Sequence, residues 1–224
     1  MALEMIPDRP GREAAFEPLL DGLLEVFSPA WVLPERMADQ HPHHRCAVKR
    51  WEVGRAAEED PDLTRQYADR LIDAAMHDQC RSGINQLIRP LVESLGHRWT
   101  QEQIIEYLRS GTNAQKVGAT MAWYFSRPGL KYASREDLAN QTPTPESKAV
   151  LDALSDLRAD YRNAVLAAFL ACEDLETRQD LSLWISLKTS TYPDALQSDH
   201  QRAKEIILAN PDDYRLMLQR CGQS

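Results

Sequence analysis

The chain has 224 residues with a net charge of −8 and a sequence pI near 5.3. Its length allows one sizeable core. The composition, with 43% hydrophobic and 27% charged residues, is typical of a folded soluble protein. The acidic balance disfavours non-specific polyanion binding, which normally needs a basic surplus. Only 9 glycines are present, and the common residues Ala, Leu, Arg, Glu and Gln all favour helices. We therefore expect an all-α protein.

The cysteines and the N-terminal residues indicate the cellular compartment that we expect for the protein. Cys46, Cys80, Cys172 and Cys221 form no C-x-x-C pair, and we expect reduced thiols in a cytoplasmic protein. Residues 1–8 lack a basic region followed by an apolar run, so no secretory signal is expected. No window approaches the roughly 18 apolar residues that a membrane span needs, and no membrane partner is expected.

Apolar residues recur at helical spacing through the first half of the chain. Pro90 is expected to kink or split one of these helices, and Thr100 with Gln103 is a candidate capping box for another. The tight reversal at 110–113 predicts an αα-hairpin between the last two helices. The helices predicted here cover 14–27, 45–57, 63–77, 83–95, 101–109 and 114–126.

The segment 127–146 differs in character, because it is polar, contains several prolines and shows little periodicity. It predicts a long loop with one short helical turn near 134–139. Helices resume over 145–171, with a break near Ala159, and continue over 175–187, 195–209 and 211–219. The sequence thus predicts nine to eleven helices, no strand and a single domain over residues 1–224.

Three stretches of the chain resemble one another. Asp62-Leu63-Thr64-Arg65-Gln66 recurs, with one residue inserted, at 174–179, and a weaker copy lies at 112–117. Each copy opens an apolar-periodic helix, and the copies place a basic residue (Arg65, Lys116 or Arg178) in its first turns. This pattern resembles the HEAT repeat.

The resemblance implies stacked antiparallel helix pairs that form a right-handed α-solenoid, whose second helices line a concave face. It also implies that the basic positions Arg65, Lys116 and Arg178 are structural and bond the turn of a neighbouring repeat. HEAT-like folds include DNA glycosylases that remove alkylated bases, but no motif of those enzymes maps onto this sequence residue by residue.

One group of residues is a candidate metal site. His41, His43 and His44 follow one another closely, and imidazoles are common ligands of zinc. No C-x-x-C or H-E-x-x-H frame supplies further ligands. We therefore expect a solvated loop leading into a helix, and neither a metal ion nor another cofactor. Phosphate-binding loops and a nucleophile elbow are absent as well.

Aromatic residues suggest where a partner could bind. Trp123 and Trp184 fall on apolar stripes and are expected to pack in the core. Trp99, Tyr124, Arg127 and Tyr132 are the candidate contact surface, because aromatic residues and arginine are enriched in binding hot spots.

These observations leave more than one function open. The first hypothesis is a non-catalytic interaction protein (an adaptor, regulator or inhibitor) that binds a protein or peptide on the concave face. The alternative is a HEAT-like DNA glycosylase or another enzyme acting on nucleic acid, which the acidic charge disfavours. A small-molecule role between helices is a third reading, and only the histidine cluster suggests it.

Overall fold

The computed structural model of the chain describes residues 13–78 and 80–222. Within these residues the protein is all-helical, as the sequence predicts, with thirteen α-helices, two short 3₁₀-helices and no strand. Residues 1–8, on which the expectation about a secretory signal rests, lie outside the described part. No described helix is both long and apolar enough to cross a lipid bilayer.

The helices follow one another with short connections. The N-terminal half contains α1 (Glu13–Phe27), α2 (Glu35–Ala38), α3 (Pro42–Glu59), α4 (Pro61–Gln66), α5 (Ala68–His77), α6 (Asn85–Ser110) and α7 (Asn113–Phe125). The C-terminal half contains α8 (Arg135–Ala139), α9 (Pro145–Ala153), α10 (Ser155–Ala171), α11 (Leu175–Ser182), η1 (Thr189–Thr191), η2 (Asp194–Leu196), α12 (Gln197–Ala209) and α13 (Arg215–Arg220).

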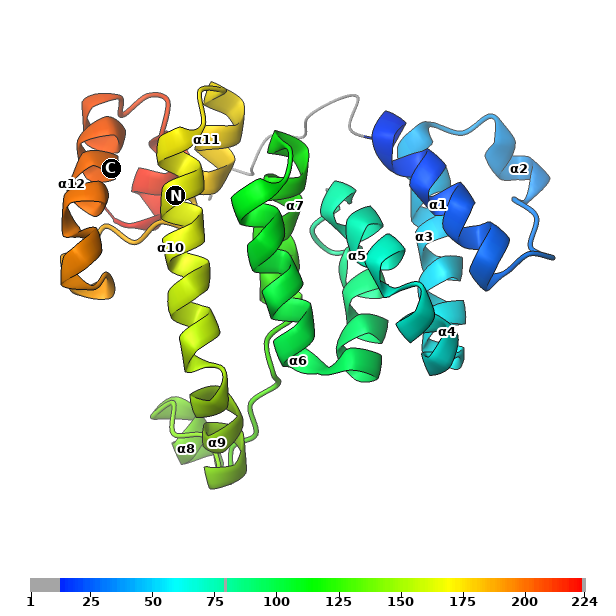
Figure 1. Cartoon of the computed structure of the whole chain (residues 1–224), viewed down its shortest axis with the longest axis horizontal. Helices are drawn as coiled ribbons and strands as arrows, with labels where there is room; N and C mark the ends of the chain where they lie inside the picture. The colour runs from blue at the N-terminus through cyan, green and yellow to red at the C-terminus, as the bar shows by residue number, and fades with distance from the viewer. Residues whose placement is uncertain (1–12, 79, 223–224) are drawn as a thin grey trace.

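The longer helices pack in two rows along the molecule (Figure 1). In one row α3 contacts α6, α6 contacts α10, and α10 contacts α12; in the other, α1 contacts α5, α5 contacts α7, and α7 contacts α11. Contacts between α1 and α3, between α6 and both α5 and α7, and between α10 and α11 join the rows. Buried apolar side chains fill the space between the helices from α1 to α13. The site described below lies where α7 and α10 meet their neighbours.

The second row contains one very close contact, at Gly118 of α7. A Cβ atom at this position would lie 1.9 Å from the carbonyl oxygen of Met76 in α5. Only glycine lets the two backbones approach this closely. The absence of a side chain at Gly118 therefore sets the distance between α5 and α7.

Helix α6 is bent at Gly96, and the sequence-based expectation for this region needs correction. Pro90 lies inside the helix without breaking it, whereas Gly96 has φ 87° and ψ 164°. Pro90 is buried among the residues that pack α6 against its neighbours. Thr100 forms no capping box, because its hydroxyl donates instead to the carbonyl of Gly96 at 3.0 Å.

Other helix boundaries also differ from the prediction. The segment 63–77 divides at Tyr67, and the later break falls at Leu154, not at Ala159. Leu154 is buried, and Arg98 donates to the carbonyl of Ala153 at 2.5 Å, which satisfies a group that the break exposes. Helix α11 ends at residue 182 and α13 begins at 215, so both are shorter than expected. The split at Tyr67, together with α2 and α8, raises the helix count to thirteen in the described residues, although α6 joins two predicted helices.

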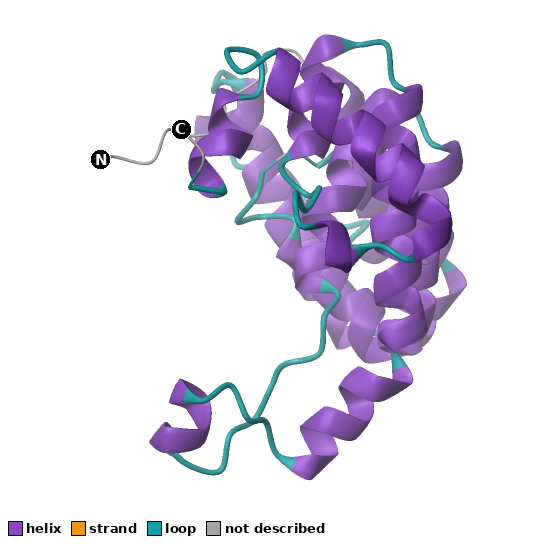
Figure 2. Ribbon diagram, turned by 90° about the vertical axis from the view of Figure 1, so that its left-hand side faces the viewer, coloured by secondary structure: helices purple, strands orange, loops and turns teal. Residues whose placement is uncertain are grey.

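The segment 127–146 is largely loop, as predicted, and contains the short helix α8. Ser134 caps α8 by accepting from the amide of Asp137 at 3.0 Å. Together α8 and α9 project from the body of the molecule (Figure 2). Few side chains of this projection are buried, and Leu138 and Val150 are 55% and 42% exposed.

The first test of this fold concerns Gly96. Its backbone lies in a region that L-residues rarely adopt, although a Cβ there would meet no atom within 4 Å. We expect Gly96→Ala to lower the free energy of unfolding by about 1–3 kcal/mol through backbone strain alone. Gly129→Ala is the matched control, because a Cβ there also meets nothing and its φ is not positive. Urea unfolding that gives equal stabilities for both variants would contradict this account.

A second test concerns the ion-pair cluster between α1 and α3. Both carboxylate oxygens of Glu17 accept from Arg45, at 2.8 and 2.7 Å, and Lys49 donates at 2.9 Å. The hydrogen bonds from Arg45 and the nearby Lys49 lower the pKa of Glu17 from 4.5 to about 2. Because the folded-state pKa lies below the unfolded value, this stabilisation is present above the unfolded pKa and is lost as the pH falls towards the folded pKa.

We therefore expect Glu17→Gln to lower stability near neutral pH by about 2 kcal/mol and to flatten its dependence on pH below about 5. Urea unfolding of both proteins over this pH range measures the effect. Parallel pH curves for wild type and variant would refute it.

Candidate functional site

Two neighbouring pockets share Tyr124 and Phe125 at the C-terminal end of α7. One lies between α7 and α11, and the other lies between α7, the loop after it, and α9–α10. We name them the α7–α11 pocket and the α7–α10 pocket, and together the Tyr124 groove. Tyr124 is 55% exposed, so its aromatic ring is in contact with solvent between the two pockets.

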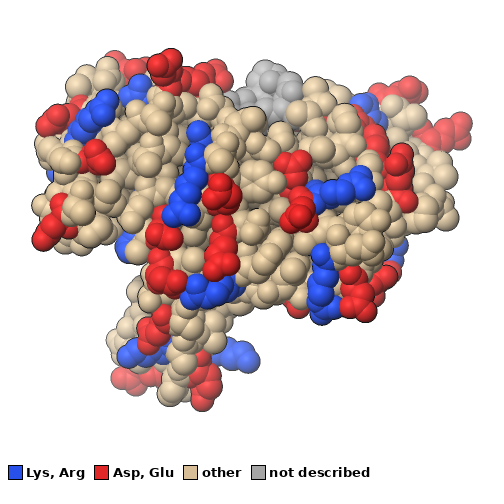
Figure 3. Space-filling view, in the orientation of Figure 1, with Lys and Arg blue, Asp and Glu red and all other residues tan. Residues whose placement is uncertain are grey.

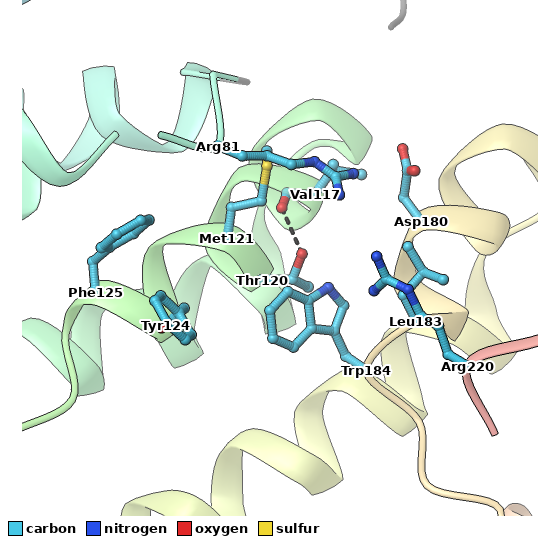
Figure 4. Close-up of a pocket in the computed structure, with 10 residues that line it drawn as sticks. All are labelled: Arg81, Val117, Thr120, Met121, Tyr124, Phe125, Asp180, Leu183, Trp184 and Arg220. Carbon is cyan, nitrogen blue, oxygen red and sulfur yellow. Dashed lines mark hydrogen bonds between the residues drawn. The ribbon is translucent and has the colours of Figure 1, made fainter. Parts of the chain in front are cut away.

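The α7–α11 pocket encloses about 250 Å³ and has a mainly apolar wall (Figure 4). Its apolar lining consists of Val117, Met121, Tyr124, Phe125, Leu183 and Trp184. Its polar lining consists of Arg81, Thr120, Asp180 and Arg220. The hydroxyl of Thr120 donates to the carbonyl of Val117 at 2.7 Å. Apolar walls with a few polar groups at the edge are typical of binding pockets.

Arg81 enters the pocket from the loop before α6, and a buried ion pair holds that loop. Arg50 of α3 donates from Nη1 to both carboxylate oxygens of Asp78, at 3.0 and 3.1 Å. The amide of Cys80 donates to Asp78 at 2.9 Å. Burial raises the pKa of Asp78 to about 6, although Arg50 and the Cys80 amide oppose this shift. The loop that presents Arg81 is therefore fixed to α3.

The α7–α10 pocket is larger, about 480 Å³, which is within the usual range for ligand pockets. Its apolar lining consists of Tyr124, Phe125, Pro128, Leu130, Leu151 and Leu154. Its polar lining consists of Gln101, Arg127 and Arg158. The pocket thus combines an apolar wall with two cationic side chains.

The two arginines of the α7–α10 pocket are held by backbone and ring contacts. Arg127 lies over the ring of Tyr124, 4.7 Å from its centroid, and donates from Nε to the Tyr124 carbonyl at 3.4 Å. Arg158 donates from Nη2 to the carbonyl of Leu151 at 3.1 Å. Neither forms a salt bridge with a carboxylate of residues 13–78 or 80–222. Their charge is therefore not neutralised by described residues.

Gln101 is a buried polar residue in the wall of this pocket, 1% exposed. Its Nε2 donates to the carbonyl of Ser126 at 3.0 Å, and His97 Nδ1 lies 2.8 Å from the same oxygen. The Oε1 of Gln101 has no hydrogen-bond partner among the described residues. An unpaired acceptor of this kind is uncommon in a protein interior.

Behind the groove, α7 and α10 are joined by a stacked aromatic pair. The rings of Trp123 and Tyr161 lie 4.1 Å apart at 8°. Tyr161 is 5% exposed, and its hydroxyl has no hydrogen-bond partner in the described structure. Burial raises the pKa of this hydroxyl well above its usual value. Tyr161 therefore contributes through packing of its ring.

The candidate contact residues do not all come together. Tyr124 and Arg127 touch each other and line the groove. Trp99 is half-buried and packs against the core, and Tyr132 is half-buried in the segment before α8; neither lines the two pockets. Only the Tyr124–Arg127 pair of the proposed surface is thus at the candidate site.

Helix N-caps lie at or just before the repeated sequence stretches. Asp60, two residues before the first stretch, accepts from the amide of Leu63 at the start of α4, and Asp174, the first residue of the second stretch, accepts from that of Thr177 at the start of α11. At the start of α7, Thr112 and Gln115 form a capping box. These contacts fix where the helices begin.

The three basic residues in these stretches have different environments. Arg65 donates to the carbonyl of Ser94 in α6 at 3.0 Å and to Asp62 at 2.5 Å, so it ties α4 to its neighbour. Arg178 lies over the ring of Phe169, 5.4 Å from its centroid. Lys116 is half-buried, and its side chain makes no ion pair within the described residues.

The histidine cluster lies in the first turn of α3, where the sequence suggested a loop. His41 is the N-cap, and its Nδ1 accepts from the amide of His43 at 3.2 Å. The rings of His43 and His44 lie edge to face at 5.7 Å. In the described structure no group of three or more His, Cys, Asp or Glu residues could hold a metal ion.

Sequence reasoning missed most residues of the groove. Trp184 was expected in the core, yet it is half-buried and lines a pocket. Gln101, Arg158 and Arg220 carried no sequence signal, because tertiary packing alone brings them next to α7. On the face in Figure 3 basic and acidic side chains are interspersed. The α7–α10 pocket differs, because its lining contains Arg127 and Arg158 but no Asp or Glu.

Comparisons with known proteins give no relative: no protein-family model, curated protein or solved structure matches the chain.

The Tyr161 hydroxyl, which has no partner in the described structure, allows a test of the packing behind the groove. We expect Tyr161→Phe to raise the free energy of unfolding by about 1 kcal/mol, because it removes a buried polar group without a partner and keeps the ring stack. Tyr107→Phe is the control, since the Tyr107 hydroxyl donates to Asp73 at 3.3 Å, and this variant should be less stable. Urea unfolding measures both. A destabilised Tyr161→Phe would show that the hydroxyl has a bonding role.

Proposed function

We propose that this chain is a non-catalytic interaction protein that binds a peptide segment of a protein partner in the Tyr124 groove. The observation that carries the proposal is an exposed aromatic side chain, Tyr124, between two pockets with apolar walls. Binding hot spots are enriched in tyrosine, tryptophan and arginine that fill or border such pockets. The groove contains all three residue types.

We also propose that the two rows of helices form a HEAT-like α-solenoid of antiparallel pairs in a single domain. The row contacts support this, because each long helix from α1 to α10 touches the next helix of its row and a partner in the other row. The contact from Arg65 to the carbonyl of Ser94 is of the kind that the resemblance implies. In such stacks, neighbouring units create extended surfaces for partners.

The dimensions of the groove suit a short peptide better than a compact ligand. Two pockets of about 250 and 480 Å³ lie side by side and share the Tyr124 and Phe125 side chains. A chain in extended conformation advances roughly 3.3 Å per residue, so a few residues suffice to place side chains in both pockets.

A nucleic-acid-acting enzyme is the second candidate, and one observation favours it. Asp180 is buried and lines the α7–α11 pocket together with Trp184 and two arginines. A carboxylate beside an aromatic ring and basic groups is an arrangement that could handle an extruded base. The net charge of −8 opposes binding to a phosphate backbone.

Selection from a random peptide library displayed on phage tests the proposal. We expect the full chain to enrich peptides that bind as free synthetic peptides. Tyr124→Ala should weaken them roughly tenfold or more, the effect of losing a hot-spot residue. Trp51→Ala is a matched control, because Trp51 on α3 is 54% exposed, as Tyr124 is 55% exposed, but lies outside both pockets.

Peptides whose affinity falls equally with both variants, or a selection without binders, would reject the groove as the binding site. Thermal unfolding of each variant controls for loss of fold. Cleavage or base release from alkylated DNA that depends on Asp180 would instead support the enzyme.

A further inference from the structure

The arginines of this protein fall into two groups, those that form a salt bridge with a carboxylate and those that do not. Several exposed arginines lie against carboxylates: Arg55 bonds Glu52 and Glu59, and Arg98 bonds Asp156. This is expected in a chain with 34 acidic and 26 basic residues. Arg127 and Arg158 of the α7–α10 pocket belong to the arginines that have no salt bridge within the described structure, as does Arg202 of α12, but these two line a pocket.

The charge of this pocket is opposite to that of the whole chain. Its lining contains two arginines and no Asp or Glu, whereas the chain carries −8. Low-dielectric walls strengthen the attraction of a cationic pocket for an anion. A carboxylate is a suitable ligand, because guanidinium groups donate two parallel hydrogen bonds to it.

The two guanidinium groups are already oriented by other contacts. Arg127 is held over Tyr124, and Arg158 is held at the carbonyl of Leu151. Each of these hydrogen bonds uses one nitrogen, which leaves other N–H groups for a ligand. Holding the side chains in place lowers the entropy that binding would cost.

The wall of the same pocket also contains a hydrogen-bond acceptor without a partner, Gln101 Oε1. Its amide is fixed by the donation from Nε2 to the carbonyl of Ser126. The Oε1 atom is itself buried in the wall, so Gln101 shapes the pocket beside the two arginines.

We infer that the partner segment is acidic: an apolar side chain enters the α7–α11 pocket, and an adjacent Asp or Glu carboxylate binds between Arg127 and Arg158. The inference rests on the proposed function and specifies its ligand. The lining of the α7–α11 pocket contains Arg81, Arg220 and one carboxylate, Asp180, so the lining of the whole groove is positively charged. Binding is therefore selective for sequences that combine apolar and acidic residues.

The test uses the peptides selected from the random library and the full chain. Selected peptides are expected to contain more Asp and Glu than the unselected library. Their affinity, measured by fluorescence anisotropy, should fall roughly tenfold in the double variant Arg127→Gln/Arg158→Gln and should weaken with added salt. Arg202→Gln on α12 is the control, because Arg202 is exposed and lines neither pocket. It should leave the affinity unchanged.

Each other outcome is informative. Binders that depend on Tyr124 but lack acidic enrichment, or that are unaffected by the double variant, overturn the inference and leave the proposed function standing. A single-stranded DNA oligonucleotide that displaces the peptides and loses affinity in the double variant overturns it in favour of nucleic acid. A selection without binders that depend on Tyr124 rejects both the inference and the proposed function.

Discussion

The left-handed backbone at Gly96 is the constraint on which the arrangement of helices depends. Before it, α6 packs beside α3 and α4, where Gln86 accepts from Arg50 and Ser94 accepts from Arg65. After it, α6 contacts α7 and α10, where Gln101 bonds Ser126. Helix α6 thereby packs against one group of helices before Gly96 and against another group after it. Without the change of direction, the second half of α6 could not reach both α7 and α10.

The groove is a consequence of that bend. His97 and Gln101 both reach the carbonyl of Ser126, immediately after the last turn of α7. This contact ends α7 at a defined position, from which the next residue, Arg127, turns back over the ring of Tyr124. The stack of Trp123 on Tyr161 then places α10 beside α7. Local contacts of single residues therefore shape the Tyr124 groove at the ends of helices.

The sequence predicts what depends on near neighbours in the chain. Apolar periodicity identified the long helices, and the repeated stretches at 112–117 and 174–179 marked helix starts, which Thr112 and Asp174 cap. It misjudged Pro90 because packing can accommodate a proline inside a helix. The two pockets could not be predicted from the sequence for a related reason. Trp184 and Arg158 acquire their role from helices distant in sequence, and no local pattern encodes those contacts.

The contact at Gly118 has a mechanical consequence. Because the backbones of α5 and α7 touch there without an intervening side chain, a rotamer change at this point cannot alter the spacing of these helices. Between α7 and α11, by contrast, side chains fill the joint and line the smaller pocket. Rearrangement of those side chains can therefore change the width of that pocket.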